Sequence, residues 1–136
     1  MSWSEAVRTL VEARASGRCE YCLLDRTDAG FPHQIDHVIS RKHGGTSQPD
    51  NLAFACYLCN LYKGSDIASI HAGSGELVRL FHPRQDRWAE HFRIVGPVIE
   101  PLTDIGAVTA HLLRFNISTR VIERRLLQTL DRYPKS

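Results

Sequence analysis

Two cysteine pairs of the form C-x2-C constrain this chain more than any other feature of its sequence. Cys19 and Cys22 form the first pair, Cys56 and Cys59 form the second, and the 136-residue chain has four cysteines in all. Two residues between cysteines let both sulfurs face one ion, and four thiolates can close a tetrahedron around Zn²⁺. The duplicated spacing therefore predicts a structural zinc, against the alternative of four buried or incidental cysteines.

Whether these thiols stay reduced depends on the compartment of the protein, which the N-terminal segment and the apolar runs of the sequence help to predict. No apolar run approaches the roughly 18 residues needed to cross a bilayer, and the N-terminal segment MSWSEAVRTL lacks a basic start followed by an apolar stretch. We therefore expect a cytoplasmic protein without a membrane partner. In the cytosol thiols stay reduced, and paired cysteines there indicate a metal more often than disulfides.

Length and composition indicate one soluble globular domain, because 43% of the residues are apolar and 24% are charged. We expect a single domain over residues 1–136, with a zinc-stapled core over 17–70 and a C-terminal β/α extension over 76–136. The formal net charge of +2 is too small to prove a polyanion partner. Residues 64–136 hold the basic excess, with ten basic and eight acidic side chains, which is compatible with phosphate contacts.

Hydrophobic periodicity and turn residues predict a mixed α+β fold. Ser2 and Glu5 match a capping box at the start of the first helix. The 33 residues between the cysteine pairs exceed the spacing of a simple zinc ribbon, so a strand, loop and strand unit must be inserted there. The expected elements are a helix over 2–16, strands over 34–39 and 52–55, a helix from 60 towards 70, strands over 76–82 and 91–99, and two C-terminal helices starting near 104 and 118.

The insertion contains an Asp36-His37 dipeptide that suits phosphodiester hydrolysis. Strand alternation puts Ile35 and His37 on one face and Asp36 on the other, although a bulged strand end can bring neighbours towards one site. A carboxylate is an oxygen ligand for Mg²⁺ or Mn²⁺, and a neutral imidazole can act as a general base for water. Hydrolysis of a phosphodiester needs both, since the metal stabilises charge while the base makes the nucleophile.

The residues around this dipeptide resemble the HNH endonucleases, whose ββα-metal motif is often stapled by a four-cysteine zinc. The resemblance covers about a third of the chain and rests on Ile35-Asp36-His37, Gly44-Gly45, Asp50-Asn51-Leu52 and the run CYLCNLYKG over residues 56–64. It implies a ββα-metal core stapled by the four-cysteine zinc. We expect an N-terminal helix, a small additional β hairpin and C-terminal helices around that core.

The resemblance also implies a role for each matching residue. His37 would be the general base, Asp36 a ligand of the catalytic divalent metal, and Asn51 a brace for the loop that orients the His37 ring. Asn60 stands at the third family position, which is often histidine. An Asn oxygen in place of a His nitrogen favours Mg²⁺ or Mn²⁺ over Zn²⁺ or Ni²⁺ at the catalytic site.

These residues predict a metal-dependent endonuclease that nicks one strand of DNA per active site and acts as a monomer or homodimer. The alternative is a catalytically inactive zinc-ribbon module that binds DNA without cutting it. We expect the nucleic-acid backbone to contact basic residues near the dipeptide, namely Arg41, Lys42, His43 and Lys63, although each can equally be a solvated surface residue.

The C-terminal half contains a second group of basic and aromatic residues between 79 and 93. We expect its aromatic side chains, Phe81, Trp88 and Phe92, to pack on the core. Four arginines of this segment are compatible either with a surface for the DNA backbone or with ordinary solvation: Arg79, Arg84, Arg87 and Arg93.

Overall fold

The computed structural model describes residues 3–135 as five α-helices and three two-stranded antiparallel sheets. The predicted α+β class is therefore confirmed. The elements are α1 (Glu5–Arg14), β1 (Gln34–His37), β2 (Leu52–Ala55), α2 (Tyr57–Lys63), β3 (Ala68–Ile70), β4 (Leu77–Arg79), α3 (Trp88–His91), β5 (Phe92–Val95), β6 (Val98–Pro101), α4 (Asp104–Leu112) and α5 (Ser118–Thr129). No helix in this part of the chain is long and apolar enough to cross a membrane.

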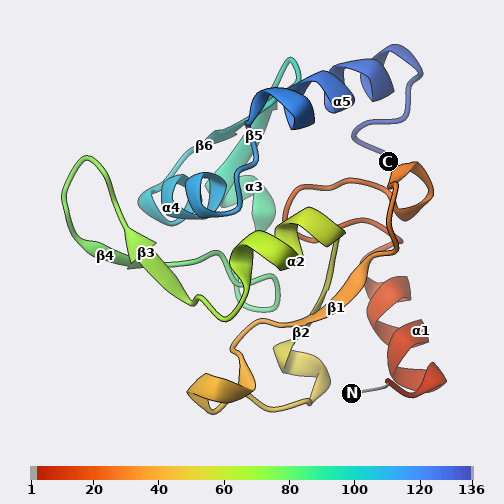
Figure 1. The fold of residues 1–136 in the computed structure, drawn as a ribbon, viewed down its shortest axis with the longest axis vertical. Coiled ribbons are helices and arrows are strands. Elements are labelled where there is room, and N and C mark those ends of the chain that lie inside the picture. The colour runs from red at the N-terminus through yellow and green to blue at the C-terminus, as the bar shows by residue number, and fades with distance from the viewer. Residues whose placement is uncertain (1–2, 136) are drawn as a thin grey trace.

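The N-terminal helix α1 is shorter than predicted and packs beside β2 (Figure 1). The capping Ser2 of the sequence prediction lies outside the described residues. Ser4 instead caps α1, since its hydroxyl accepts a hydrogen bond from the Val7 amide at 3.2 Å. At the other end of α1, the Arg14 guanidinium donates to the Leu52 carbonyl oxygen at 2.7 Å, which ties the helix to β2.

The central unit is a hairpin followed by a helix. β1 and β2 pair antiparallel with Gln34 opposite Ala55 and His37 opposite Leu52, and α2 follows after one residue. The predicted helix from 60 towards 70 is wrong at both ends, because α2 begins at Tyr57 and ends at Lys63. Gly64 stops it with a φ of +50°, a backbone conformation that favours glycine.

Two hairpins follow this unit where one was expected. β3, which replaces the end of the predicted helix, pairs with β4 and projects from the body of the molecule (Figure 1). The predicted single strand over 91–99 is instead the hairpin of β5 and β6. Its turn falls at Gly96 and Pro97, where Gly96 has a φ of +58° and proline disfavours continued strand pairing.

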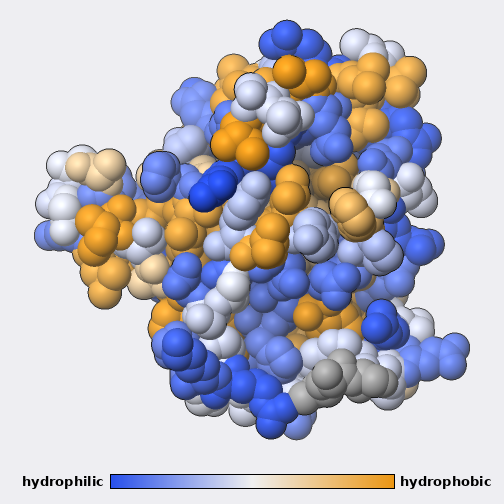
Figure 2. All heavy atoms as spheres, in the orientation of Figure 1, coloured by the Kyte–Doolittle hydropathy of each residue, from blue (hydrophilic) through white to orange (hydrophobic). Residues whose placement is uncertain are grey.

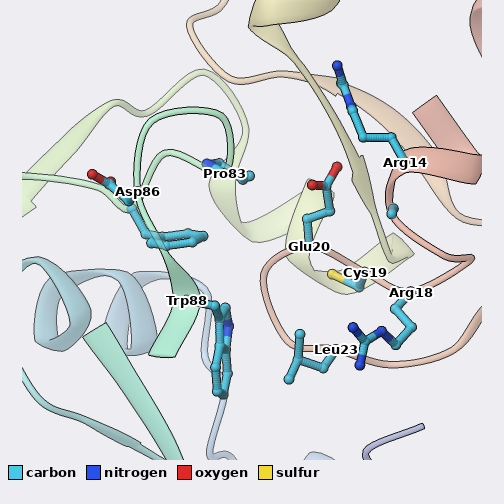
Figure 3. A pocket seen from close by; sticks show the side chains of 10 residues that line it. Arg14, Arg18, Cys19, Glu20, Leu23, Pro83, Asp86 and Trp88 are labelled. Atoms are coloured by element: carbon cyan, nitrogen blue, oxygen red, sulfur yellow. The ribbon is translucent and has the colours of Figure 1, made fainter. Parts of the chain in front are cut away.

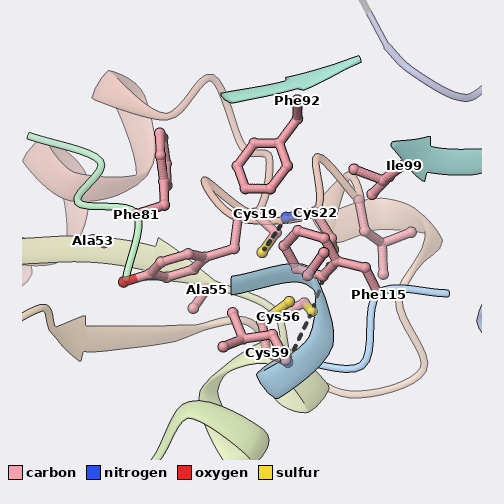
Figure 4. Close-up of a cluster of buried hydrophobic side chains, with 14 of the residues drawn as sticks. Cys19, Cys22, Ala53, Ala55, Cys56, Cys59, Phe81, Phe92, Ile99 and Phe115 are labelled. Atoms are coloured by element: carbon pink, nitrogen blue, oxygen red, sulfur yellow. Dashed lines mark hydrogen bonds between the residues drawn. The ribbon is translucent and has the colours of Figure 1, made fainter. Parts of the chain in front are cut away.

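One buried cluster joins the hairpin-helix unit to the C-terminal elements. It includes the four cysteines, Ala53 and Ala55 of β2 and the aromatic residues Phe81, Phe92 and Phe115 (Figure 4). Trp88 packs against the same cluster. The prediction that the aromatic residues of the second half pack on the core is thus confirmed.

Helix α5 packs with a face that its apolar pattern does not predict. Its buried residues are Arg120, Arg124 and Leu127. Its most apolar stripe faces outwards, and Figure 2 shows hydrophobic side chains on the surface where α5 lies in Figure 1. The exposed stripe consists of Ile122, Leu126 and Leu130.

Candidate metal centre and active site

Two tight turns bring the four cysteines to one point. Cys19 and Cys22 lie in the turn that follows α1, Cys56 caps α2 and Cys59 lies in its first turn. All four are buried and free of disulfides, and their sulfur atoms lie within 4.8 Å of one another. A tetrahedron with metal-sulfur bonds of about 2.3 Å has sulfurs about 3.8 Å apart, and the Cys22 and Cys56 sulfurs are 3.6 Å apart. The cluster therefore has the donors and dimensions of a closed metal site.

A buried arginine from α5 completes the surroundings of the cysteine cluster. The Arg120 guanidinium lies 3.3 Å from the Cys59 sulfur and 3.7 Å from the Cys56 sulfur, and it donates to the Leu113 carbonyl oxygen at 2.8 Å. Burial by itself lowers the pKa of Arg120, but the negative sulfurs outweigh burial and raise it. Because four thiolates around a divalent ion leave a net charge of −2, Arg120 supplies a compensating positive charge.

Asp36 lies on the buried face of β1, where its carboxylate has two protein partners. The Tyr21 hydroxyl donates to Oδ2 at 2.7 Å. The Lys63 ammonium lies 3.3 Å from Oδ1 and 3.2 Å from Oδ2, and it also donates to the His37 carbonyl oxygen at 3.1 Å. Burial raises the pKa of Asp36, while Lys63 and Tyr21 act in the opposite direction.

The position of Lys63 differs from the sequence prediction. We expected its ammonium to reach a phosphate, but the side chain is only 1% exposed. One turn after Asn60 on α2, it points inwards because Asp36 offers a buried counter-charge. In this arrangement Lys63 is a structural ion-pair partner and not a surface contact for nucleic acid.

His37 ends β1 with its ring on the face opposite to Asp36, as strand alternation predicts. The ring is partly exposed, lies 5.2 Å from the ring of Trp3 by centroids and is joined through Nε2 to the Ser47 hydroxyl at 3.0 Å. Partial burial, together with the positive charges of Arg41 and Lys63, lowers the pKa of His37, whereas Asp36 opposes that shift. The imidazole is therefore neutral near pH 7, the form that can accept a proton.

Asn51 fixes the loop between β1 and β2. Its side-chain oxygen accepts from the Ile39 amide at 2.9 Å, and its side-chain nitrogen donates to the carbonyl oxygens of Ile39 and Thr46 at 2.9 and 2.7 Å. Gly45 lets the loop close, because a β-carbon there would lie 1.7 Å from the Ile39 carbonyl oxygen. These contacts hold the loop that carries Ser47 beside the His37 ring.

Within residues 3–135, the other expected site residues share no side-chain hydrogen bond with one another. Asn60 is half-buried on α2, and within residues 3–135 no hydrogen bond joins its side chain to Asp36 or His37. Arg41, Lys42 and His43 form an exposed 3₁₀ turn that follows β1. The structure thus groups Asp36 with Lys63 and Tyr21 on one side of β1, and His37 with Ser47 and Trp3 on the other.

Three of the four arginines between residues 79 and 93, Arg79, Arg84 and Arg93, are held in ion pairs. Arg79 binds Asp86 through both terminal nitrogens at 2.7 and 2.8 Å, and Arg84 pairs with Glu20. A pocket of about 170 Å³ is lined in part by Glu20, Asp86 and Trp88 (Figure 3). Basic and acidic side chains both line this pocket, so it does not form the continuous basic surface that would bind along a DNA backbone.

Sequence reasoning missed three side chains that complete these sites. Tyr21, between the first two cysteines, carries no signal for its bond to Asp36. Ser47 is one of several polar loop residues. Arg120 could have been suspected only from its spacing with Arg124 and Leu127, which puts all three on one helix face.

An antiparallel hairpin, a following helix and a four-cysteine cluster, whose pairs lie before β1 and at the start of α2, are the elements of the ββα-metal architecture. Consistent with this, residues 19–66 match the family model described as HNH endonuclease. The match spans both cysteine pairs, β1, β2 and α2, so the resemblance predicted from the sequence is confirmed over this segment. Comparisons with curated proteins and with solved structures found no match.

Proposed function

We propose that the protein is a metal-dependent endonuclease of the HNH type that hydrolyses phosphodiester bonds of DNA. The observation that supports this most strongly is the position of His37. Its partly exposed ring lies at the end of β1, inside the segment that matches the HNH endonucleases. A neutral imidazole at this place can take a proton from water.

The loop between the strands prepares His37 for this role. Asn51 and Gly45 close the loop, and Ser47 contacts the ring nitrogen Nε2 from its exposed side. Trp3 packs against the same ring, with the two ring centroids 5.2 Å apart. A base that is held in one orientation needs less reorganisation when substrate arrives.

Two metals belong to this proposal. The four cysteine sulfurs would hold one structural Zn²⁺, because they are close enough together to close a tetrahedron around it. For the catalytic ion, the carboxylate of Asp36 and the side-chain oxygen of Asn60 are donors of the type that Mg²⁺ and Mn²⁺ prefer, so the residue types fit. When bound, such an ion stabilises negative charge on the phosphate and the leaving oxygen.

Arg41, Lys42 and His43 are proposed to contact the DNA backbone, because their exposed turn lies in the loop that follows β1 and His37. One active site cuts one strand, so a monomer nicks duplex DNA and double-strand cleavage needs two protomers or two events. We also propose that residues 1–136 act as one domain, since a single buried cluster includes residues from Cys19 to Tyr133.

One observation favours a second candidate function, a zinc-stabilised module that binds DNA without cutting it. Both carboxylate oxygens of Asp36 have protein partners in Tyr21 and Lys63. If that ion pair never opens, the catalytic ion lacks its carboxylate ligand.

A plasmid assay separates the two functions. In Mg²⁺ or Mn²⁺ the wild-type protein should convert supercoiled plasmid into open circles before linear DNA appears, and His37→Ala and Asn60→Ala should not. Equal cleavage by all three proteins contradicts the assignment of the active site. Absence of cleavage by the wild-type protein, together with retarded plasmid mobility, favours the binding module.

A further inference from the structure

The Lys63 ammonium occupies a buried position that is surrounded by oxygen atoms. Asp36 Oδ1, Asp36 Oδ2 and the His37 carbonyl oxygen lie 3.3, 3.2 and 3.1 Å from Nζ. Lys63 and Asp36 are only 1% and 3% exposed. The carboxylate and carbonyl oxygens that surround this positive charge are donors of the type that bind a hard cation.

We propose that Lys63 is a displaceable internal cation, which holds the Asp36 carboxylate in the metal-free protein and leaves it when a divalent ion binds. The inference rests on the proposed function, because it concerns the same catalytic ion. It explains how Asp36 can be fully paired in the structure and still serve as a ligand.

Charge prevents the ammonium and a divalent ion from sharing Asp36. Mg²⁺ binds oxygen at about 2.0–2.1 Å, so an ion on Asp36 would lie within a few ångströms of the present ammonium position. Two cations at that separation in a buried place repel each other strongly. Binding of the divalent ion therefore requires Lys63 to move.

The structure has space into which the Lys63 side chain can move. A cavity of about 160 Å³ is lined by Lys63, by Val38 and Ile39 just after β1, and by residues from the end of β4 onwards. Its titratable members besides Lys63 are Arg79 and His82. Arg79 is already paired with Asp86, and burial lowers the pKa of His82, so His82 adds no charge near pH 7.

The exchange predicts that the metal-free protein resists divalent ions. An ion that binds only the Lys63-released state has its apparent affinity reduced by the fraction of protein in that state. Replacing Lys63 by the uncharged, similarly long methionine removes the competitor. Lys63→Met should bind Mn²⁺ at least about tenfold more tightly than the wild-type protein. Lys135→Met, a control that removes a partly exposed lysine paired with Asp25, should bind as wild type.

Acylation of lysines tests the exchange in the unaltered protein, since Lys42, Lys63 and Lys135 are the only lysines of the sequence. With an acetylating reagent and mass spectrometry, Lys63 should be protected without added Mn²⁺ and become labelled as Mn²⁺ is added. Exposed Lys42 should label at all Mn²⁺ concentrations. The zinc content is measured in each sample to confirm that the cysteine site stays loaded.

Plasmid nicking measured in the same samples distinguishes a failure of this inference from a failure of the proposed function. Nicking in Mn²⁺ while Lys63 stays protected overturns the exchange and leaves the nuclease assignment intact. Labelling of Lys63 that rises with Mn²⁺ supports the exchange even if no plasmid is cut. A folded Lys63→Met protein that binds Mn²⁺ no better than wild type also overturns the exchange, and if that variant fails to fold, the labelling result decides.

Discussion

Removal of the Arg120 guanidinium should destabilise the protein far more than an ordinary arginine substitution. Arg120 is 4% exposed, contacts the sulfurs of Cys56 and Cys59 and donates to the Leu113 carbonyl oxygen. Loss of one partner from a buried charge pair costs roughly 3–5 kcal/mol, and an unsatisfied buried carbonyl adds to that cost. Arg120→Met should therefore lower the free energy of unfolding by about 4 kcal/mol.

Urea unfolding at a fixed concentration of free zinc, followed by tryptophan fluorescence, measures this change. Arg120→Lys keeps the charge but lacks the planar fork, so its loss should be intermediate. Arg125→Met replaces an exposed arginine of the same helix and serves as the control, with a change within about 0.5 kcal/mol. If Arg120→Met unfolds as easily as Arg125→Met, the cysteine cluster does not need the compensating charge.

Three further predictions concern the metal centre, the loop and the acid stability. Elemental analysis of the purified protein should find about one zinc per chain, and Cys56→Ser should lose it and unfold, because four thiolates are needed to close the site; a zinc-free protein with two disulfides would exclude the metal site. Asn51→Ala should lower the free energy of unfolding by about 2–3 kcal/mol, as it removes three part-buried hydrogen bonds that hold the loop, and it should slow nicking. Unchanged thermal unfolding would show that the loop does not depend on this amide. The Arg79 guanidinium lowers the pKa of Asp86 below its ordinary value of 3.8. The pair therefore stabilises the fold fully at pH values above 3.8, and this stabilisation is lost as the pH falls through the lowered pKa. Wild type should therefore exceed Asp86→Asn in urea midpoint at pH 5 and approach it near pH 2, and a constant difference would contradict the pairing.

The hairpin-helix unit was largely predictable because its signals are local. Cysteine spacing, glycine and proline in the loop and two-residue alternation fix the strands and put His37 and Asp36 on opposite faces. The helix after Cys59 was placed wrongly because its end depends on one glycine, Gly64, whose positive φ the apolar pattern does not reveal. Residues beyond it could then pair as a strand.

The buried charges were not predictable from local patterns. Lys63 and Arg120 are residue types that usually lie at the surface, and each is buried here because an acceptor from a distant part of the chain meets it. For Lys63 that acceptor is Asp36, 27 residues earlier. For Arg120 it is the cysteine cluster, 61 residues away at Cys59. Such pairing is visible only in the tertiary fold. The apolar stripe of α5 was the stronger sequence signal for a buried face, but the structure exposes it.

The rate of DNA cleavage by His37→Ala at full zinc occupancy tests the central claim most directly. The claim is that the cysteines hold a structural ion while His37 supplies the base at a separate site. His37→Ala should therefore keep one zinc and the wild-type unfolding curve, yet cleave plasmid at least about a hundredfold more slowly. His111→Ala, on the exposed face of α4, should cleave at the wild-type rate. A zinc-loaded His37→Ala protein that nicks as fast as the wild-type protein would contradict the account.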